Sequence, residues 1–274
     1  MILDFHTHTF PDSLAPRAVA KLEAASNLTA FTDGTLNGLL NSMKASGIDH
    51  SVILPVVTNP LHTENINNLA AQSNSLPGIT SFGGMHPRLE GWEAELKRIA
   101  GLGLPGIKLH PDYQTCFADD PAMLPLVDTA LELGLHVLLH TGFDNGRPEI
   151  THGTPHRLAA LLDTLEAKKP LAHRTASVIL AHGGGYRYWD DAEALLVGRP
   201  VYLDTSFCLG HMPQEQFLRL LRRHGIQRIL FGTDSPWDGQ AEQIKAITSL
   251  GLNDEELACI LWRNGAGLLG LNEQ

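Results

Sequence analysis

The stretch DFHTHTF, residues 4–10, places two histidines two positions apart after the short apolar run Met1–Leu3. Side chains two apart on a β-strand point to the same side, so we expect His6 and His8 to face one direction together. Asp4 shares their parity and is expected to lie deeper. A metal-binding pair and a polar strand end give the same pattern, so the stretch by itself leaves both interpretations open.

Short runs rich in Val, Ile and Leu alternate along the 274-residue chain with longer segments of helical periodicity. This alternation is typical of repeated βα units around a parallel sheet. The predicted strands are Ile2–Phe5, Ser51–Val57, Ile79–Gly84, Gly106–Leu109, His136–His140, Ser177–Ala181, Val201–Asp204 and Arg228–Phe231.

The intervening segments carry helix signals. PAMLPLVDTALELG (121–134), LEGWEAELKRIAGLG (89–103) and PQEQFLRLLRRHG (213–225) are apolar at spacings of three and four and end at glycine. Segments 112–119 and 143–155 are predicted loops. Eight strands and about as many helices predict an α/β protein, a (β/α)₈ TIM barrel with one domain over residues 1–274. An open doubly wound sheet is the competing layout.

Histidines and one aspartate recur at a single position of this rhythm, where a predicted apolar strand ends. They are His86, His110, His140, His182 and Asp234. The carboxyl ends of parallel barrel strands meet at one mouth, so these side chains become neighbours of His6 and His8. Imidazole and carboxylate are good ligands for zinc and related metals, and a catalytic metal activates a bound water.

The motifs DFHTHTF, GIKLHP, LLHTG, LAHGGG and FGTDSPW follow one another at successive strand ends. With this set the chain resembles the amidohydrolase superfamily, amidohydrolase family 2, in the branch that includes aminocarboxymuconate-semialdehyde decarboxylase. The resemblance covers the whole chain. It implies that His6, His8, His140 and Asp234 hold the metal and that His182 beside it transfers protons.

The resemblance also bears on the number of metal ions. A second ion needs a bridging carboxylate or a lysine carboxylated by carbon dioxide, and Lys108 is the candidate. Lys108 shares the parity of Gly106 and His110, which leaves a bridge open, although His182 could also bind a second ion. We expect one Zn²⁺, with Mn²⁺, Fe²⁺ or a second ion as alternatives.

Other residues near the predicted mouth are candidates for substrate binding. His86 and His110 precede proline, Arg147 could grip a carboxylate, and Tyr186 and Trp237 could line the pocket. For each, a purely structural or solvated role is the competing interpretation, as it is for Arg157, Arg187 and the glycines 183–185. The remaining histidines, among them His152 and His156, are predicted to be structural, and Cys116 to be an ordinary loop thiol.

Composition and net charge argue against several classes of protein. The net charge is −10 and there is no run of Lys or Arg, so nucleic acid is not an expected partner. No apolar run is long enough to span a bilayer, and no signal-peptide pattern is present. Three scattered cysteines fit a reducing compartment, so the expected location is the cytoplasm. A homodimer is compatible with the sequence.

The sequence therefore predicts a metal-dependent hydrolase in which a metal-bound water attacks a small carboxylated amide, ester or lactone and His182 or Asp234 moves the proton. Non-oxidative decarboxylation of an aromatic or muconate-type acid would use the same residues and is the first alternative. A phosphoesterase, and a barrel that binds a ligand without turnover, are further alternatives.

Overall fold

A computed structural model describes residues 1–272, so the last two residues of the predicted 1–274 domain lie outside the described residues. The strands are β1 (Leu3–Thr7), β2 (His50–Ile53), β3 (Ile79–Ser81), β4 (Gly83–Gly84), β5 (Gly106–Leu109), β6 (His136–Leu139), β7 (Val178–Leu180), β8 (Tyr202–Asp204) and β9 (Ile229–Leu230). The α-helices are α1 (Ala15–Ser26), α2 (Leu36–Ser46), α3 (Thr63–Ser73), α4 (Trp92–Gly101), α5 (Pro111–Gln114), α6 (Met123–Glu132), α7 (Pro155–Lys168), α8 (Trp189–Leu195), α9 (Gln214–His224), α10 (Gln240–Thr248), α11 (Asp254–Ala258) and α12 (Asn264–Leu269).

The nine strand segments form the eight strands of a closed parallel barrel. β3 and β4 are the two halves of the predicted strand 79–84: β3 pairs with β2, and β4 pairs with β5. β1 and β9 close the ring, because the N–H of Phe5 donates to the carbonyl of Phe231 over 2.7 Å and Thr7 bridges to Ser235. The predicted single-domain TIM barrel is confirmed, and the open sheet is excluded.

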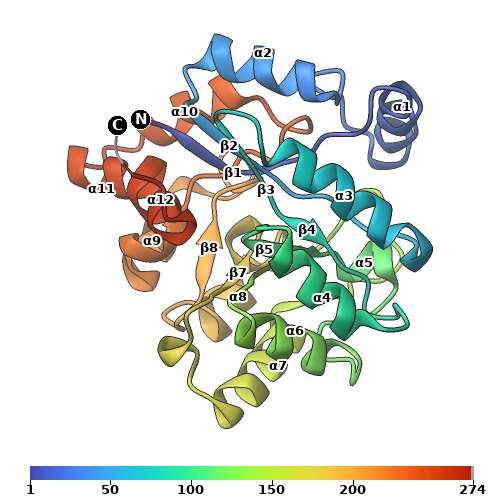
Figure 1. Ribbon diagram of the computed structural model, residues 1–274. Helices are drawn as coiled ribbons and strands as arrows, with labels where there is room; N and C mark the ends of the chain where they lie inside the picture. Colours follow the sequence, from blue (N-terminus) through green and yellow to red (C-terminus); the bar gives the residue numbers. More distant parts are fainter. Residues whose placement is uncertain (273–274) are drawn as a thin grey trace.

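The helices surround the strands, as Figure 1 shows. All eight predicted strands exist; Gly106–Leu109 and Ile79–Gly84 have the predicted ends, and the others are shifted at one end or both. β2 stops at Ile53 rather than at Val57, since Pro55 cannot donate to a neighbouring strand. The predicted loop 112–119 includes most of the short helix α5, which has Pro111 at its start, where a missing N–H costs nothing.

A bulge in β1 corrects the expected position of Asp4. The three steps from Asp4 to Thr7 face only two steps of β2, so β1 has one extra residue and the alternation of sides changes. Asp4 does not lie beneath His6. Its carboxylate instead accepts hydrogen bonds from Thr233 Oγ1 over 2.6 Å and from Gln240 Nε2 of α10 over 2.8 Å.

Apolar side chains fill the space enclosed by the strands below the histidines. Phe5 and Phe82 meet edge to face with ring centroids 5.9 Å apart. This inner core comprises Leu3, Phe5, Val52, Leu54, Phe82, Leu138, Ile179, Ala181 and Leu230, together with Trp262 and Ala266 from the C-terminal segment. A packed interior leaves only the carboxyl ends of the strands for polar chemistry.

Two helices follow β1, and only one of them belongs to the ring. α2 packs toward α10 through a cluster that includes Leu39 and Ile244. In Figure 1, α1 lies at the right-hand edge beyond α3, away from the ring of strands. Only Ala15 and Val19 of α1 are buried, so this helix is an addition to the barrel near its mouth.

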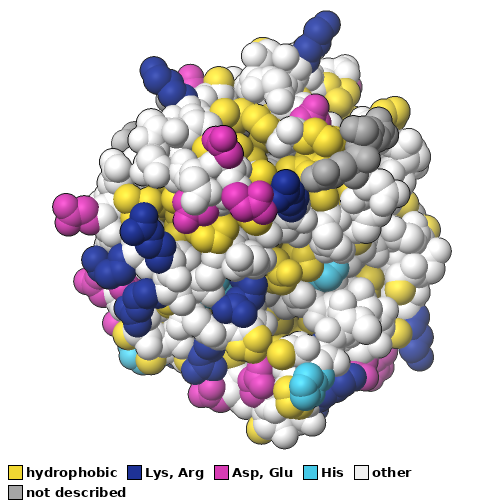
Figure 2. Space-filling view, turned by 90° about the vertical axis from the view of Figure 1, so that its left-hand side faces the viewer, with side chains coloured by type: hydrophobic (Ala, Val, Ile, Leu, Met, Phe, Trp, Pro, Cys, Tyr) yellow, Lys and Arg dark blue, Asp and Glu magenta, His cyan; other side chains and the backbone are white. Residues whose placement is uncertain are grey.

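Figure 2 shows the face that carries α9, α11 and α12, where Lys and Arg side chains are interspersed with Asp and Glu. Within residues 1–272, no helix is both long enough and apolar enough to cross a membrane.

Candidate metal centre

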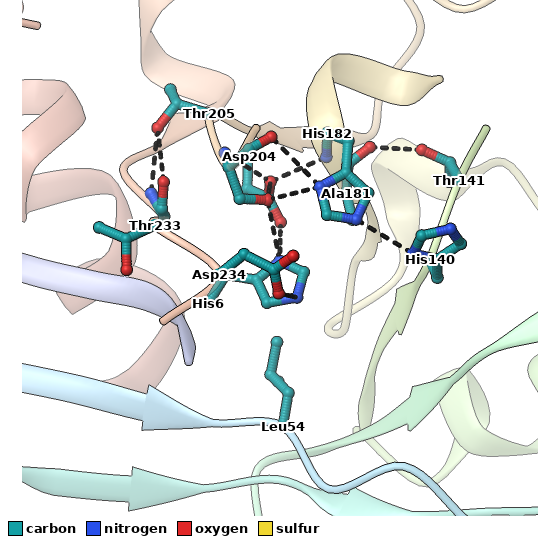
Figure 3. A network of polar contacts seen from close by, with 12 residues as sticks. His6, Leu54, His140, Thr141, Ala181, His182, Asp204, Thr205, Thr233 and Asp234 are labelled. Atoms are coloured by element: carbon teal, nitrogen blue, oxygen red, sulfur yellow. Dashed lines mark hydrogen bonds and ion pairs between the residues drawn. The ribbon is translucent and has the colours of Figure 1, made fainter. Parts of the chain in front are cut away.

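His6, His8 and Asp234 converge where β1 meets the turn after β9. The Nε2 atoms of His6 and His8 are 3.2 Å apart. Asp234 Oδ1 lies 3.3 Å from His6 Nε2 and 2.9 Å from His8 Nε2. The sequence prediction that the two histidines face the same way is confirmed, and Figure 3 shows His6 and Asp234 side by side.

Hydrogen bonds to the other ring nitrogens define the chemistry of this group. His8 Nδ1 donates to the carbonyl of Leu54 over 2.7 Å, and His6 Nδ1 donates to Asp204 Oδ2 over 2.8 Å. In the neutral rings both Nε2 atoms therefore carry lone pairs. Two lone pairs and a carboxylate oxygen that face one another need a cation or a proton between them, so the donor set fits a divalent metal.

The electrostatic environment keeps Asp234 ionised. Burial alone would raise the pKa of Asp234, but the charges and hydrogen bonds of His6, His8 and His182 lower it well below its usual range. Burial lowers the pKa of His6, and neighbouring Lys108 lowers it further, so His6 favours its neutral, metal-binding form.

Backbone conformation aims two of these side chains. His182 and Asp234 have φ angles of +56° and +66°, in the left-handed region that non-glycine residues rarely adopt. The surroundings hold both conformations in place: the N–H of His182 donates to Asp204 Oδ1 over 2.9 Å, and the N–H of Asp234 donates to the carbonyl of His6 over 2.7 Å. Strain of this kind is concentrated at functional sites.

His140 meets the group through His182. His140 Nδ1 lies 3.0 Å from His182 Nε2, while His182 Nδ1 contacts the carbonyl of Ser206 at 3.2 Å. The metal-capable atoms of His6, His182 and Asp234 all lie within 4.8 Å of one another. His140 belongs to a second group of potential metal ligands. His182 therefore connects His140 to the group that contains Asp234.

The second group contains His110, His140 and Asp144. The rings of His110 and His140 stack with centroids 4.0 Å apart, and Asp144 Oδ2 lies 3.5 Å from His110 Nε2. His140 Nε2 and Asp112 Oδ2 are buried, 3.9 Å apart and without a hydrogen-bond partner among residues 1–272. Burial raises the pKa of Asp112, and the neighbouring charge of Asp144 adds to this effect.

Lys108 points into the centre, as its parity with His110 predicts. Its Nζ atom is 3.2 Å from His6 Nε2, and only 1% of the residue is exposed. Burial lowers the pKa of Lys108 to about 8. Carboxylation requires a neutral lysine amine, and burial favours that form of Lys108. The bridging role of Lys108 stays a prediction.

A cavity of about 830 Å³ opens from these residues. Some of the remaining candidates for substrate binding line this cavity and others do not. His110, Tyr186 and Trp237 line it, with Tyr186 buried against Phe207. His86 and Arg147 are not among the lining residues of the described chain.

His86 and Arg147 take ordinary structural or surface positions. His86 Nδ1 accepts the backbone N–H of Arg88 over 3.1 Å, and the Arg147 side chain is exposed. These positions do not test substrate binding, so the predicted roles of the two residues stay predictions.

Several further predictions of structural roles are consistent with the contacts. Arg157 pairs with Asp119 over 2.6 Å, and burial raises the pKa of Cys116 to about 11, which makes it a poor nucleophile. Two N–H groups of the glycine run are used in its own turn, since Gly184 donates to Ala181 and Gly185 to His182. His152 contacts Asp112, with Nδ1 3.2 Å from Asp112 Oδ1.

Sequence reasoning missed the acids that support the histidines. Asp204 ends β8, the same strand-end position that singled out the other candidates, so its position was a usable signal. Asp112 lies in the short helix α5 and Asp144 in a loop, where no periodicity marks them. Only the folded chain shows that they face His110 and His140.

Comparison with known proteins supports the architecture. A sequence model of the amidohydrolase family matches residues 3–271, and no curated protein matches the chain by sequence. An uncharacterised TIM-barrel protein from Bordetella bronchiseptica has a similar structure, with 20% identity, a TM-score of 0.79 and 98% of each chain covered.

Two further structures come from enzymes with different reactions. One is a manganese-bound dihydroxybenzoic acid decarboxylase from Polaromonas sp. JS666, with 15% identity, a TM-score of 0.72 and 100% of this chain and 98% of that chain covered. The other is a provisionally assigned 2-pyrone-4,6-dicarboxylic acid hydrolase from Pseudomonas putida, with 20% identity, a TM-score of 0.68 and 100% and 98% covered. Identities this low show the fold, whereas the family match extends over almost the whole sequence. The chain belongs to the amidohydrolase family, whose members are metal-dependent hydrolases and decarboxylases.

Proposed function

We propose that the protein hydrolyses an ester, lactone or amide with the help of one divalent cation, with Zn²⁺ as the first candidate. His6, His8 and Asp234 would hold the cation, and His140 or His182 would complete the donor set. The convergence of His6 Nε2, His8 Nε2 and Asp234 Oδ1 within 3.3 Å supports this proposal most directly.

A bound divalent cation supplies Lewis acidity that polarises a carbonyl group and acidifies water. The protein residues perform the proton transfers. Ionised Asp234 can accept a proton from the water that attacks the carbonyl carbon, because its low pKa leaves it unprotonated at neutral pH. When the bond from the carbonyl carbon to the leaving group breaks, the same proton passes to the leaving oxygen or nitrogen.

His182 has a positioning or relay role in this scheme. Its side chain joins His140 to Ser206, and its backbone N–H is fixed by Asp204. Tyr186 and Trp237 border the cavity beside it and would exclude water from the reacting bond.

Decarboxylation is the second candidate. Lys108 places a positive charge beside His6, where it could bind the carboxylate of an acid. The reaction would then release carbon dioxide and leave a proton on the carbon atom that carried it.

The proposal is tested by the metal content per chain after gentle purification, measured by elemental analysis, together with turnover of neutral esters and lactones. We expect about one equivalent, loss of activity with a chelator, and its return with Zn²⁺ or Mn²⁺. Asp234→Asn should lose at least about 100-fold in kcat, because it removes a base that contributes about 10²–10⁴ in rate.

Asp163→Asn is the matched control, since Asp163 is a surface residue with a 66% exposed side chain. Full activity with retained metal in Asp234→Asn would refute the role of Asp234. Release of carbon dioxide from aromatic acids, without ester or lactone turnover, would favour decarboxylation.

A further inference from the structure

The cavity continues from the metal centre into an apolar groove between α1 and α3. Leu22 of α1 and Ile66 and Leu69 of α3 line the same cavity as His6 and Asp234. We call this part the α1–α3 groove. Its apolar side chains are Leu22, Leu28, Leu36, Ile66, Leu69 and Leu76.

The exposure of these leucines has no explanation in the packing of the barrel. Leu69 is 44% exposed and Leu76 is 37% exposed, although apolar side chains at a helix surface usually turn toward the core. Single exposed leucines are common on protein surfaces. Several that gather along one cavity continuous with a reactive centre are typical of a ligand-binding groove.

In the described chain, the part of the cavity lined by α1 and α3 holds no lysine or arginine that could pair with a carboxylate. Among the lining residues of the described chain, Asp12, Asp144 and Asp234 carry negative charge, and Lys108 carries the only positive charge apart from histidine. No arginine within residues 1–272 lines the cavity. An apolar chain without a carboxylate avoids the cost of burying an unpaired charge in the groove.

We propose that the α1–α3 groove binds the apolar chain of the substrate, so that the protein acts on neutral esters, lactones or amides with a long alkyl or acyl group. This inference rests on the proposed hydrolase function and adds the substrate class. It replaces the small carboxylated substrate that the sequence suggested with a neutral, elongated one.

The size of the cavity agrees with a chain of this kind. Its volume of about 830 Å³ lies in the upper part of the range, roughly 300–1,000 Å³, found for sites that hold drug-sized ligands. From Ile66 to Ser73, α3 supplies a wall about 10 Å long at a rise of about 1.5 Å per residue. A short acid would leave most of this apolar wall in contact with water.

The first test measures kcat/KM for 4-nitrophenyl esters from acetyl through butyryl, hexanoyl and octanoyl to decanoyl. Each methylene that enters the groove should raise kcat/KM about fourfold, because burying one contributes about 0.8 kcal/mol. Leu69→Arg, which places a charge in the groove, should flatten this gradient.

Leu61→Arg is the matched control. Leu61 lies just before α3, is 84% exposed and does not line the cavity, so this variant should keep the wild-type gradient. An active enzyme whose kcat/KM is independent of chain length, or a Leu69→Arg variant that keeps the full gradient, would overturn the inference.

The second test needs neither metal nor turnover, so it separates this inference from the proposed function. The neutral fluorescent probe N-phenyl-1-naphthylamine should bind saturably, and octanamide should displace it better than octanoate, whose carboxylate would be unpaired in the groove. Leu69→Arg should weaken probe binding at least tenfold. Absence of saturable binding would overturn the groove assignment even if the protein proves to be a hydrolase.

The remaining occupant to be tested is a second copy of this chain. Size-exclusion chromatography of the wild type and of Leu69→Arg distinguishes it. A dimer that Leu69→Arg converts to monomers, with no change in chain-length preference or probe binding, would assign the groove to subunit contact and contradict a substrate role.

Discussion

Asp204 is not a ligand in the proposed metal site, but it holds the ligand His6. A substitution of Asp204 therefore tests the site without removing a ligand. Its Oδ2 accepts from His6 Nδ1 over 2.8 Å, and its Oδ1 accepts from the N–H groups of His182 and Ser206 over 2.9 and 3.1 Å. Figure 3 shows these contacts as a connected network. Both carboxylate oxygens are thus used as acceptors at once.

Asparagine at position 204 cannot accept hydrogen bonds from His6 and from His182 and Ser206 at the same time. If its oxygen faces His182 and Ser206, its NH₂ group faces His6 Nδ1 and forces the ring proton onto Nε2, the atom that should bind metal. If it flips, the NH₂ group meets two N–H donors. Loss of such a supporting contact costs about 10- to 100-fold in metal affinity, or about 1.4–2.7 kcal/mol.

The assay is competition between protein and a chromophoric chelator for Zn²⁺ at neutral pH, with thermal unfolding as a check on folding. We expect Asp204→Asn to bind Zn²⁺ about 10- to 100-fold more weakly and Asp163→Asn to match the wild type. Unchanged Zn²⁺ affinity in a folded Asp204→Asn variant would show that His6 does not bind the metal through Nε2, which would refute the reasoning.

Two further predictions concern stability. Burial lowers the pKa of His224 from 6.5 to about 4, so the unfolded chain takes up a proton between these values while the folded chain does not. The free energy of unfolding should therefore fall by up to about 3 kcal/mol as the pH drops through this range. His224→Gln should reduce that slope in urea titrations, and an unchanged slope would contradict the assignment. Gly142 and Gly47 both have φ above +70°, but a Cβ at Gly142 would collide with the backbone of Tyr186, whereas nothing lies within 4 Å at Gly47. Gly47→Ala should cost about 1–2 kcal/mol in calorimetry and Gly142→Ala clearly more; equal costs would argue against the close approach.

Local sequence patterns determined the barrel and half of the candidate site. Apolar runs with period two and helical runs with period 3.6 are set by neighbours in the chain, so the strand order and the strand-end histidines could be read directly. His6, His8, Lys108 and Asp234 meet as predicted because parallel strands bring their carboxyl ends together.

Only the tertiary structure decided the details that control the chemistry. The bulge in β1 turned the Asp4 carboxylate toward Thr233 and Gln240, a change of one residue that hydrophobic alternation does not reveal. Asp112 of the short helix α5 and Asp144 of a loop reach His140 and His110, and the paths of both segments depend on contacts distant in sequence. The α1–α3 groove arises in the same way: its leucines come from different segments of the chain, and only the folded structure brings them to one cavity with His6 and Asp234.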